Sequence, residues 1–299
     1  MSVSRAAMTT RIDIHRLLRD HARTFALTLR LLPSSLREPL GIAYLLARAS
    51  DTIADAPGIP TDRKLRLLGE LETLLGDGGP QSWNPGSHGG FSSAEAGLMD
   101  SVPDLLRVLE GLSDRDSIYS LWRTILRGQL FDLKRFEPGA EPLSAQELDR
   151  YCGLVAGSVG EFWTRLIAKH GHGVLRLPLE EMIRLGIAYG KGLQLVNILR
   201  DRRADLLLGR RYAQDADLPG LFDQAEEWLR LGERYLAGLR PGRILMATSL
   251  PLDLAVPTLA GIRNSPGDAR VSLGRREVRR ILLRGVPSLW LSRCLDPAS

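Results

Sequence analysis

Two pairs of aspartates are the residues best suited to chemistry in this sequence, and both pairs have the same spacing. Asp201 and Asp205 are four residues apart, and so are Asp51 and Asp55. Residues at this spacing lie on one face of an α-helix, about 6 Å apart along its axis. Apolar residues surround both pairs, so we expect the carboxylates to face the interior, where unpaired charges are costly. Hydrated Mg²⁺, held by one or two carboxylates and a substrate phosphate, would neutralise them.

Further polar residues extend each pair into a stripe along its helix. Gln194 and Asn197 precede the second pair on the same face, and Tyr44 and Arg48 precede the first. Two such helices facing each other would place four carboxylates around one cavity, with Mg²⁺ bridging them to a diphosphate. For the second helix alone, a solvated face with Asp–Arg pairs to Arg200 and its neighbours is an equal alternative. The repetition of the pattern favours the cavity.

A glycine-rich segment, YCGLVAGSVGEFW, begins at Tyr151. Gly153, Gly157 and Gly160 share one helical face, although each glycine costs a helix roughly 1 kcal/mol relative to alanine. Another group must therefore approach this face closely. Tight packing on a second helix is the favoured explanation. The alternative is a smooth channel wall for a long apolar substrate, with Tyr151 beside it instead of serving as an ordinary core tyrosine.

Two further segments carry residues that suit a phosphate or a cation. In HARTF, Arg23 is able to donate a fork of hydrogen bonds to a phosphate, and Phe25 is able to present its ring face to a cation. The run 209–212, Gly-Arg-Arg-Tyr, follows the second aspartate pair directly and places one or two arginines at the mouth of the predicted site. The five histidines show no metal-binding spacing, so none is assigned to a metal.

Composition excludes some classes of function. The chain has 299 residues, a net charge of +5 and ordinary apolar and charged fractions, which predict a globular protein with a sizeable core. No basic stripe is interleaved with aromatic residues, which argues against nucleic-acid binding. Cys152 and Cys294 lack zinc or redox spacing, and no signal peptide precedes residue 20. These features lead us to expect a protein of the reducing cytoplasm.

Helical periodicity runs through almost the whole chain, and no stretch alternates as a strand does. We expect one all-α domain over 1–299, with a flexible Gly/Pro/Ser-rich surface loop at 76–93. The apolar run Ile244–Ile262 contains Pro251 and Pro257, which favours a buried helix broken by proline over a membrane span. The predicted helices lie near 11–30, 34–55, 61–75, 94–111, 114–135, 144–170, 179–208, 220–239, 243–262 and 275–293. The long helix that carries the second pair is expected to continue as far as Tyr212.

Four segments together resemble a known family. They are RTFALTLRLLP (23–33), YLLARASDTIAD (44–55), YCGLVAGSVG (151–160) and QLVNILRDRRADLLLGRRY (194–212). The chain is similar to squalene and phytoene synthases, the head-to-head prenyl synthases, and more to the squalene branch. The resemblance implies a helical isoprenoid synthase bundle around a central cavity. It implies that the four aspartates hold Mg²⁺ or Mn²⁺ and that two farnesyl diphosphates bind.

The resemblance also assigns roles to individual residues. Tyr151 or the released diphosphate would accept a proton, and Arg275 and Arg276 would contact NADPH during reduction to squalene. Ala54 and Ala204 stand where squalene synthases commonly have an extra acid, which implies less redundancy in Mg²⁺ binding. The implied substrate contacts are Arg23, Thr24, Phe25, Tyr44, Arg48, Val155, Gly157, Gln194, Asn197, Arg200, Arg211 and Tyr212.

Three alternatives stay open. The first is a phytoene, dehydrosqualene or presqualene diphosphate synthase that lacks the NADPH step. The second is a non-catalytic relative that acts as an assembly factor, and the third is an unrelated helical Mg²⁺ phosphohydrolase. The segment Arg280–Cys294 mixes arginine with leucine and tryptophan. A final helix packed on the body is favoured there over peripheral contact with the inner face of the membrane.

Overall fold

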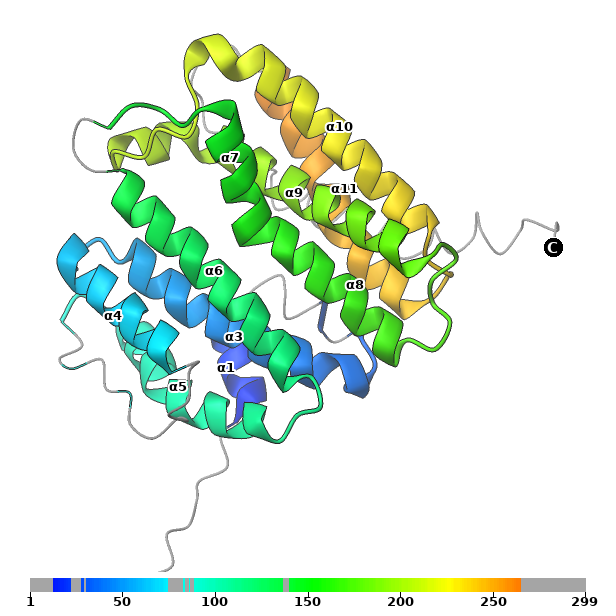
Figure 1. Ribbon diagram of the computed structural model, residues 1–299, viewed down its shortest axis with the longest axis horizontal. Coiled ribbons are helices and arrows are strands. Elements are labelled where there is room, and N and C mark those ends of the chain that lie inside the picture. Colours follow the sequence, from blue (N-terminus) through cyan, green and yellow to red (C-terminus); the bar gives the residue numbers. More distant parts are fainter. Residues whose placement is uncertain are drawn as a thin grey trace, which may run out of the picture.

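The computed structural model describes residues 13–22, 28–29, 31–74, 83, 86, 89–136 and 140–264. Over these residues the chain is a bundle of helices without strands, which confirms the all-α prediction (Figure 1). Most of the predicted loop 76–93 and the whole predicted helix 275–293 lie outside this part. The main helices are α1 (Ile14–His21), α3 (Ser34–Asp55), α4 (Thr61–Thr73), α5 (Ser93–Glu110), α6 (Arg115–Arg135), α7 (Ala145–Cys152), α8 (Ser158–His170), α9 (Leu179–Leu207), α10 (Leu218–Ala237) and α11 (Arg243–Asn264).

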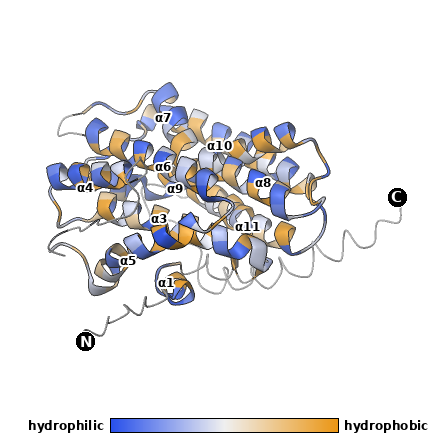
Figure 2. Ribbon diagram, turned by 60° about the horizontal axis from the view of Figure 1, so that its bottom comes forward, coloured by the Kyte–Doolittle hydropathy of each residue, from blue (hydrophilic) through white to orange (hydrophobic). Residues whose placement is uncertain are grey.

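The bundle has two halves that meet at α6 and α8. In the first half, α3 packs against α1, α4, α5 and α6; in the second, α9 packs against α8, α10 and α11 (Figure 1). Apolar residues gather on the inward faces of the helices, as Figure 2 shows by colour. Between α3 and α6, the buried indole N–H of Trp122 donates to the Ser50 hydroxyl at 3.3 Å. This bond helps to fix the side of α3 that carries Asp51.

The first helix is shorter than predicted. The Asp13 side chain accepts a hydrogen bond from the backbone N–H of Arg16 at 2.9 Å, so Asp13 is the expected cap. The helix ends at His21, where the N–H of Ala22 caps it by donating to the Leu18 carbonyl. Most of the predicted extension to residue 30 lies outside the described residues. Periodicity alone does not show such a break, since apolar residues continue on both sides of it.

One continuous helical rod runs from α7 to α8 through a π-helical turn. Ser144 and Glu147 form a reciprocal capping box at its start. The π-helix covers Gly153–Gly157, at the centre of the glycine-rich segment. Such wide turns occur mostly as short insertions in α-helices and are frequent at functional sites.

Glycines bring α8 and α9 into backbone contact. A Cβ atom at Gly160 would overlap the carbonyl oxygen of Gly186, and a Cβ atom at Gly190 would overlap the carbonyl oxygen of Ala156. The favoured explanation of the glycine face, tight helix packing, is therefore confirmed at Gly160. Gly153 differs, because nothing lies within 4 Å of the position that its Cβ would take.

The long helix α9 matches the predicted range 179–208 to within one residue, and the interpretation of 186–212 as one uninterrupted helix is wrong. Gly209 follows with a φ of 80°, which favours glycine, and the Arg210 N–H returns to the Asp205 carbonyl at 2.8 Å. The chain thus reverses at this point. The reversal directs Arg210 and Tyr212 back towards the aspartates, where a continued helix would carry them away.

The apolar helix α11 runs without a break through Pro251 and Pro257, so the expected interruption is absent. It packs on α9 and α10. By length and composition it is the one helix within the described ranges that is able to cross a membrane, and half of its apolar window is buried inside the protein. This burial agrees with the predicted core helix.

Candidate active site

Both aspartate pairs line one cavity of about 210 Å³, as their spacing predicts. The cavity is surrounded by α3, α6 and α9 and by the C-terminal end of α7. The turn that follows α9 closes one side. Its remaining wall is polar except at Ala54 and Ile198. The lining residues are Asp51, Ala54, Asp55, Gln129, Asp132, Tyr151, Gln194, Asn197, Ile198, Asp201, Asp205, Arg210 and Tyr212.

The carboxylates of this cavity repel one another. Burial and the nearby charge of Asp55 raise the pKa of Asp51 to about 6, although Arg48 donates to it at 2.7 Å. Burial also raises the pKa of Asp205 to about 6. Arg200 pairs with Asp201 at 2.5 Å. These shifts indicate a site that gains stability when a cation enters it.

The donor set suits a hydrated Mg²⁺ better than a fully enclosed ion. Among the residues that the structure describes, no three acidic, histidine or cysteine side chains are close enough to surround one ion. The two pairs instead approach the cavity from different helices and present only oxygen atoms. Mg²⁺ prefers this arrangement, because it binds through one or two carboxylates and keeps water and phosphate oxygens as its other ligands.

Arg210 is the arginine that the structure brings into the cavity. Its guanidinium pairs with Asp55 at 2.7 Å and with Asp132 at 3.4 Å. Arg211, which we expected to contact substrate, is exposed and does not line the cavity; its carbonyl accepts from the N–H of Leu143. The turn at Gly209 determines that Arg210, and not Arg211, enters the cavity. The direction of this turn is not evident from the sequence.

Two lining residues of α6 were missed from the sequence. Asp132 is buried, and burial raises its pKa despite the nearby Arg210 guanidinium. Gln129 is one turn earlier and buried, and its Oε1 has no hydrogen-bond partner within the described part of the chain. The available signal was an acid and an amide at i, i+3 on an apolar helix, which is weaker than a repeated pair of acids.

Two tyrosines stack beside Asp132. The rings of Tyr151 and Tyr212 are 5.2 Å apart between centroids and their hydroxyl oxygens are 3.3 Å apart. The Tyr212 hydroxyl donates to Asp132 Oδ1 at 2.6 Å. Both tyrosines were expected at the site, and both line the acidic cavity.

An apolar cavity of about 250 Å³ adjoins the acidic one, and both include Gln194 and Asn197. Gly160 forms part of its wall. At this residue the glycine face therefore serves both tight helix packing and a smooth cavity wall. The other lining residues are Thr28, Leu40, Ala156, Val159, Trp163, Tyr189, Gly190, Leu193, Ala247, Thr248 and Pro251.

Several expected substrate contacts have structural surroundings instead. The Val155 side chain covers Gly128 of α6, and Gly157 packs on Ile187 and Lys191 of α9, so neither lines a described cavity wall. The Tyr44 hydroxyl donates to the His21 carbonyl at 3.0 Å and ties α1 to α3. Arg48 and Arg200 reach the site only through their ion pairs with the aspartates. Arg23, Thr24, Phe25, Arg275 and Arg276 lie outside the described residues.

Comparison with known proteins agrees with this geometry. A family model described as squalene/phytoene synthase matches residues 18–213, which include both aspartate pairs and the tyrosine segment. This protein belongs to the squalene/phytoene synthase family. The match ends just after Tyr212, so it covers every residue that lines the acidic cavity.

Relatives within the family carry different names. Squalene synthase LSS of Botryococcus braunii is 27% identical over 311 residues, which cover 92% of this chain and 64% of that protein. The 15-cis-phytoene synthase of Synechocystis sp. is 29% identical over 212 residues, which cover 67% of this chain and 54% of that protein. The chain therefore spans less than two thirds of the length of either relative.

The fold is also that of a solved structure. A complex of TcSQS with the ligand E5700 superposes with a TM-score of 0.75 at 23% identity, covering 91% of this chain and 84% of that chain. At this identity the likeness concerns the fold, and it confirms the isoprenoid synthase type of bundle.

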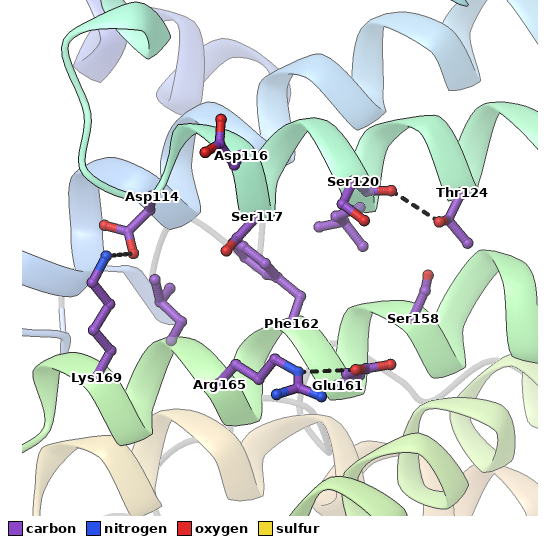
Figure 3. A pocket seen from close by; sticks show the side chains of 12 residues that line it. Asp114, Asp116, Ser117, Ser120, Thr124, Ser158, Glu161, Phe162, Arg165 and Lys169 are labelled. Carbon is purple, nitrogen blue, oxygen red and sulfur yellow. Dashed lines mark hydrogen bonds and ion pairs between the residues drawn. The ribbon is translucent and has the colours of Figure 1, made fainter. Parts of the chain in front are cut away.

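A larger groove of about 410 Å³ lies between α6 and α8 in this squalene/phytoene synthase family member (Figure 3). Phe162 points across the groove towards Ser117. Its cationic side chains are already paired: Lys169 contacts Asp114 at 2.9 Å, and Arg165 contacts Glu161 at 2.9 Å. The acidic cavity, where charges are unbalanced, is the better candidate for chemistry.

Proposed function

We propose that this protein is a squalene synthase, which condenses two farnesyl diphosphates head to head in a Mg²⁺-dependent reaction. The product of this step is presqualene diphosphate, and reduction by NADPH then gives squalene. One observation carries the proposal: the acidic cavity and the apolar cavity meet at Gln194 and Asn197. A diphosphate with a long apolar tail has the same two parts.

The acidic cavity supports binding of the diphosphate head. Asp51, Asp55, Asp201 and Asp205 would hold Mg²⁺, or Mn²⁺, through their oxygen atoms. When bound, the metal supplies a Lewis acid that stabilises the charge of the departing diphosphate. Arg210 lines the same wall and donates charge-assisted hydrogen bonds to acidic partners, so it is placed to contact phosphate oxygens as well.

The apolar cavity supports binding of the tail and protection of a carbocation. The Trp163 indole donates to the Thr248 hydroxyl at 3.1 Å, and the Tyr189 hydroxyl donates to the Thr248 carbonyl at 2.9 Å. Their polar atoms are thus occupied within the protein, and the cavity receives mainly ring and aliphatic surface. Such a wall excludes water, which would otherwise trap an allylic cation as an alcohol.

The reduction step is proposed from the sequence resemblance. In sequence, LPLDLAVPTLAGIRNSPGDARVSLGRREV (250–278) resembles a late segment of squalene synthases that leads into a basic, NADPH-associated stretch. Within it, Arg275 and Arg276 stay the predicted NADPH contacts. The alternatives without reduction are a presqualene diphosphate, dehydrosqualene or phytoene synthase. The phytoene-type relative above favours keeping C20 substrates among the candidates. A non-catalytic assembly factor is disfavoured, because both aspartate pairs line the cavity intact.

Product identification tests the proposal. Purified protein is incubated with Mg²⁺ and farnesyl diphosphate, or with geranylgeranyl diphosphate, in the presence and absence of NADPH. Squalene that forms only with NADPH is the expected result. If presqualene diphosphate or dehydrosqualene forms both with and without NADPH, the reduction step is refuted and the condensation step stands. No consumption of either substrate would overturn the enzymatic proposal.

A further inference from the structure

We propose that Asp132 is the final proton acceptor of the condensation step, reached from the cavity through Tyr151 and Tyr212. This inference rests on the proposed function, which requires that a cationic intermediate lose a proton when the cyclopropane ring closes. It adds to that function a residue of α6 and a path that the sequence did not reveal.

The geometry supplies a continuous path. Tyr151 lines the acidic cavity, and its hydroxyl oxygen is 3.3 Å from that of Tyr212. The Tyr212 hydroxyl donates to Asp132 at 2.6 Å, a short bond to a charged acceptor. Ring stacking at 5.2 Å holds the two phenols in register, and Phe136 packs edge-on against Tyr212 at 4.9 Å.

Tyr151 is a poor final acceptor when it acts alone. Burial raises its pKa above the ordinary value for tyrosine, so it is a neutral phenol at physiological pH. A neutral phenol that takes a proton becomes a strongly acidic oxonium ion, unless it passes on its own proton. The bond to Tyr212 provides that exit.

Asp132 is suited to receive the proton because its surroundings keep it ionised before the reaction and also increase its affinity for a proton. The Arg210 guanidinium at 3.4 Å favours the carboxylate before the reaction, whereas burial raises the pKa of Asp132 and so increases its proton affinity. The charged or titratable groups that interact with it are Arg210, Tyr212, Tyr151, Asp55 and Asp205. It lines the same cavity as the four aspartates that are expected to hold metal, and it shares the Arg210 guanidinium with Asp55.

The transfer balances without any added reactant. The substrate C–H bond breaks, and its electron pair forms the last carbon–carbon bond of the cyclopropane. The proton goes to the Tyr151 oxygen while the Tyr151 proton moves to Tyr212 and the Tyr212 proton moves to Asp132. Both tyrosines end as neutral phenols, and the Asp132 carboxylate ends as a carboxylic acid.

Product partition in three variants tests the path. Asp132→Asn keeps an oxygen that accepts from Tyr212 but is not able to take up the proton, and Tyr212→Phe removes the middle of the path. Asp116→Asn, an exposed aspartate of the same helix, is the matched control. Each protein is given farnesyl diphosphate and Mg²⁺ without NADPH, and the released diphosphate and the organic products are quantified.

The expected result is a change of product at retained ionisation. Asp132→Asn and Tyr212→Phe should release diphosphate within about tenfold of the wild-type rate, whereas the ratio of presqualene diphosphate to prenyl alcohols falls at least tenfold. Asp116→Asn should keep the wild-type ratio. A loss of packing would lower the rate without changing this ratio, so the ratio distinguishes proton transfer from a structural role.

Two results would overturn the inference while leaving the proposed function intact. Wild-type product ratios in both variants would make the released diphosphate the proton acceptor. Loss of diphosphate release in Asp132→Asn would place Asp132 in the ionisation step. A wild-type protein that consumes no farnesyl or geranylgeranyl diphosphate would overturn the proposed function and the inference together.

Discussion

Neighbouring arginines after α9 should differ sharply in importance. Arg210 pairs with Asp55 and Asp132 in the acidic cavity, whereas Arg211 is exposed. We expect Arg210→Gln to remove most activity and to destabilise the protein, and Arg211→Gln to change neither. Both variants replace an arginine by a glutamine, and the two positions are adjacent. Each variant is therefore the control for the other.

The magnitude follows from the contacts of Arg210. Its side chain is 19% exposed, and removing one partner of a buried ion pair costs roughly 3–5 kcal/mol. The Asp55 side chain is 53% exposed, which weakens that pair, so we expect a loss of about 2 kcal/mol in unfolding free energy. Over 299 residues, at about 2.1 cal/mol/K of unfolding entropy per residue, this corresponds to a fall of roughly 3 °C in Tm. Removing one preorganised donor to developing charge typically lowers kcat by about 10²–10³.

Calorimetry and a diphosphate-release assay measure both effects. Arg211→Gln should stay within about 0.5 kcal/mol of the wild type, as surface substitutions usually do. Equal losses of activity in the two variants would show that both arginines reach the substrate, which would refute the placement derived from the turn at Gly209. Full activity in Arg210→Gln would remove Arg210 from the site.

Three further predictions test separate parts of the structure. Asp51→Asn or Asp201→Asn should abolish turnover while the fold survives, and wild-type turnover would refute the metal assignment. Asp51→Asn should also raise the Tm of the metal-free protein, because it removes a carboxylate that is disfavoured by burial and by repulsion with Asp55. Gly160→Ala should lower the unfolding free energy by about 1–3 kcal/mol through overlap with Gly186, whereas Gly153→Ala, which has open space, should not; equal Tm values in calorimetry would contradict the close contact. Burial opposes ionisation of Asp114, but hydrogen bonds from Lys169 and His170 outweigh it and lower its pKa. Its stabilisation, about 1–3 kcal/mol, is therefore complete above the unfolded pKa of about 3.9 and is lost as pH falls below it. The difference in urea stability between wild type and Asp114→Asn should shrink from pH 5 to pH 3, and a constant difference would count against these bonds.

Much of the fold followed from the sequence, because periodicity and capping residues act locally. The helix boundaries of α3 and α6 differ from the predicted ones by at most one residue, and Ser144 begins the rod that was predicted at 144–170. The convergence of the aspartates also followed, since a repeated i, i+4 spacing fixes which face of each helix carries them.

The remaining features depend on contacts between distant segments. Asp132 becomes important only because α6 lies beside Tyr212, which is 80 residues later in the chain. The choice of Arg210 over Arg211 depends on one residue with positive φ. The π-helical turn at Gly153–Gly157 has no local signal beyond its glycines, because the same glycines are compatible with an ordinary α-helix.

The backbone contact between α8 and α9 also limits how this protein is able to change its substrate. Gly160 and Gly190 form part of the apolar wall, yet any side chain at either position would collide with the facing helix before it reached the cavity. Redesign for longer or shorter tails therefore has to act elsewhere on the wall. Trp163, Leu193 and Ala247 line the same cavity from three different helices, and they are the positions at which volume is adjustable.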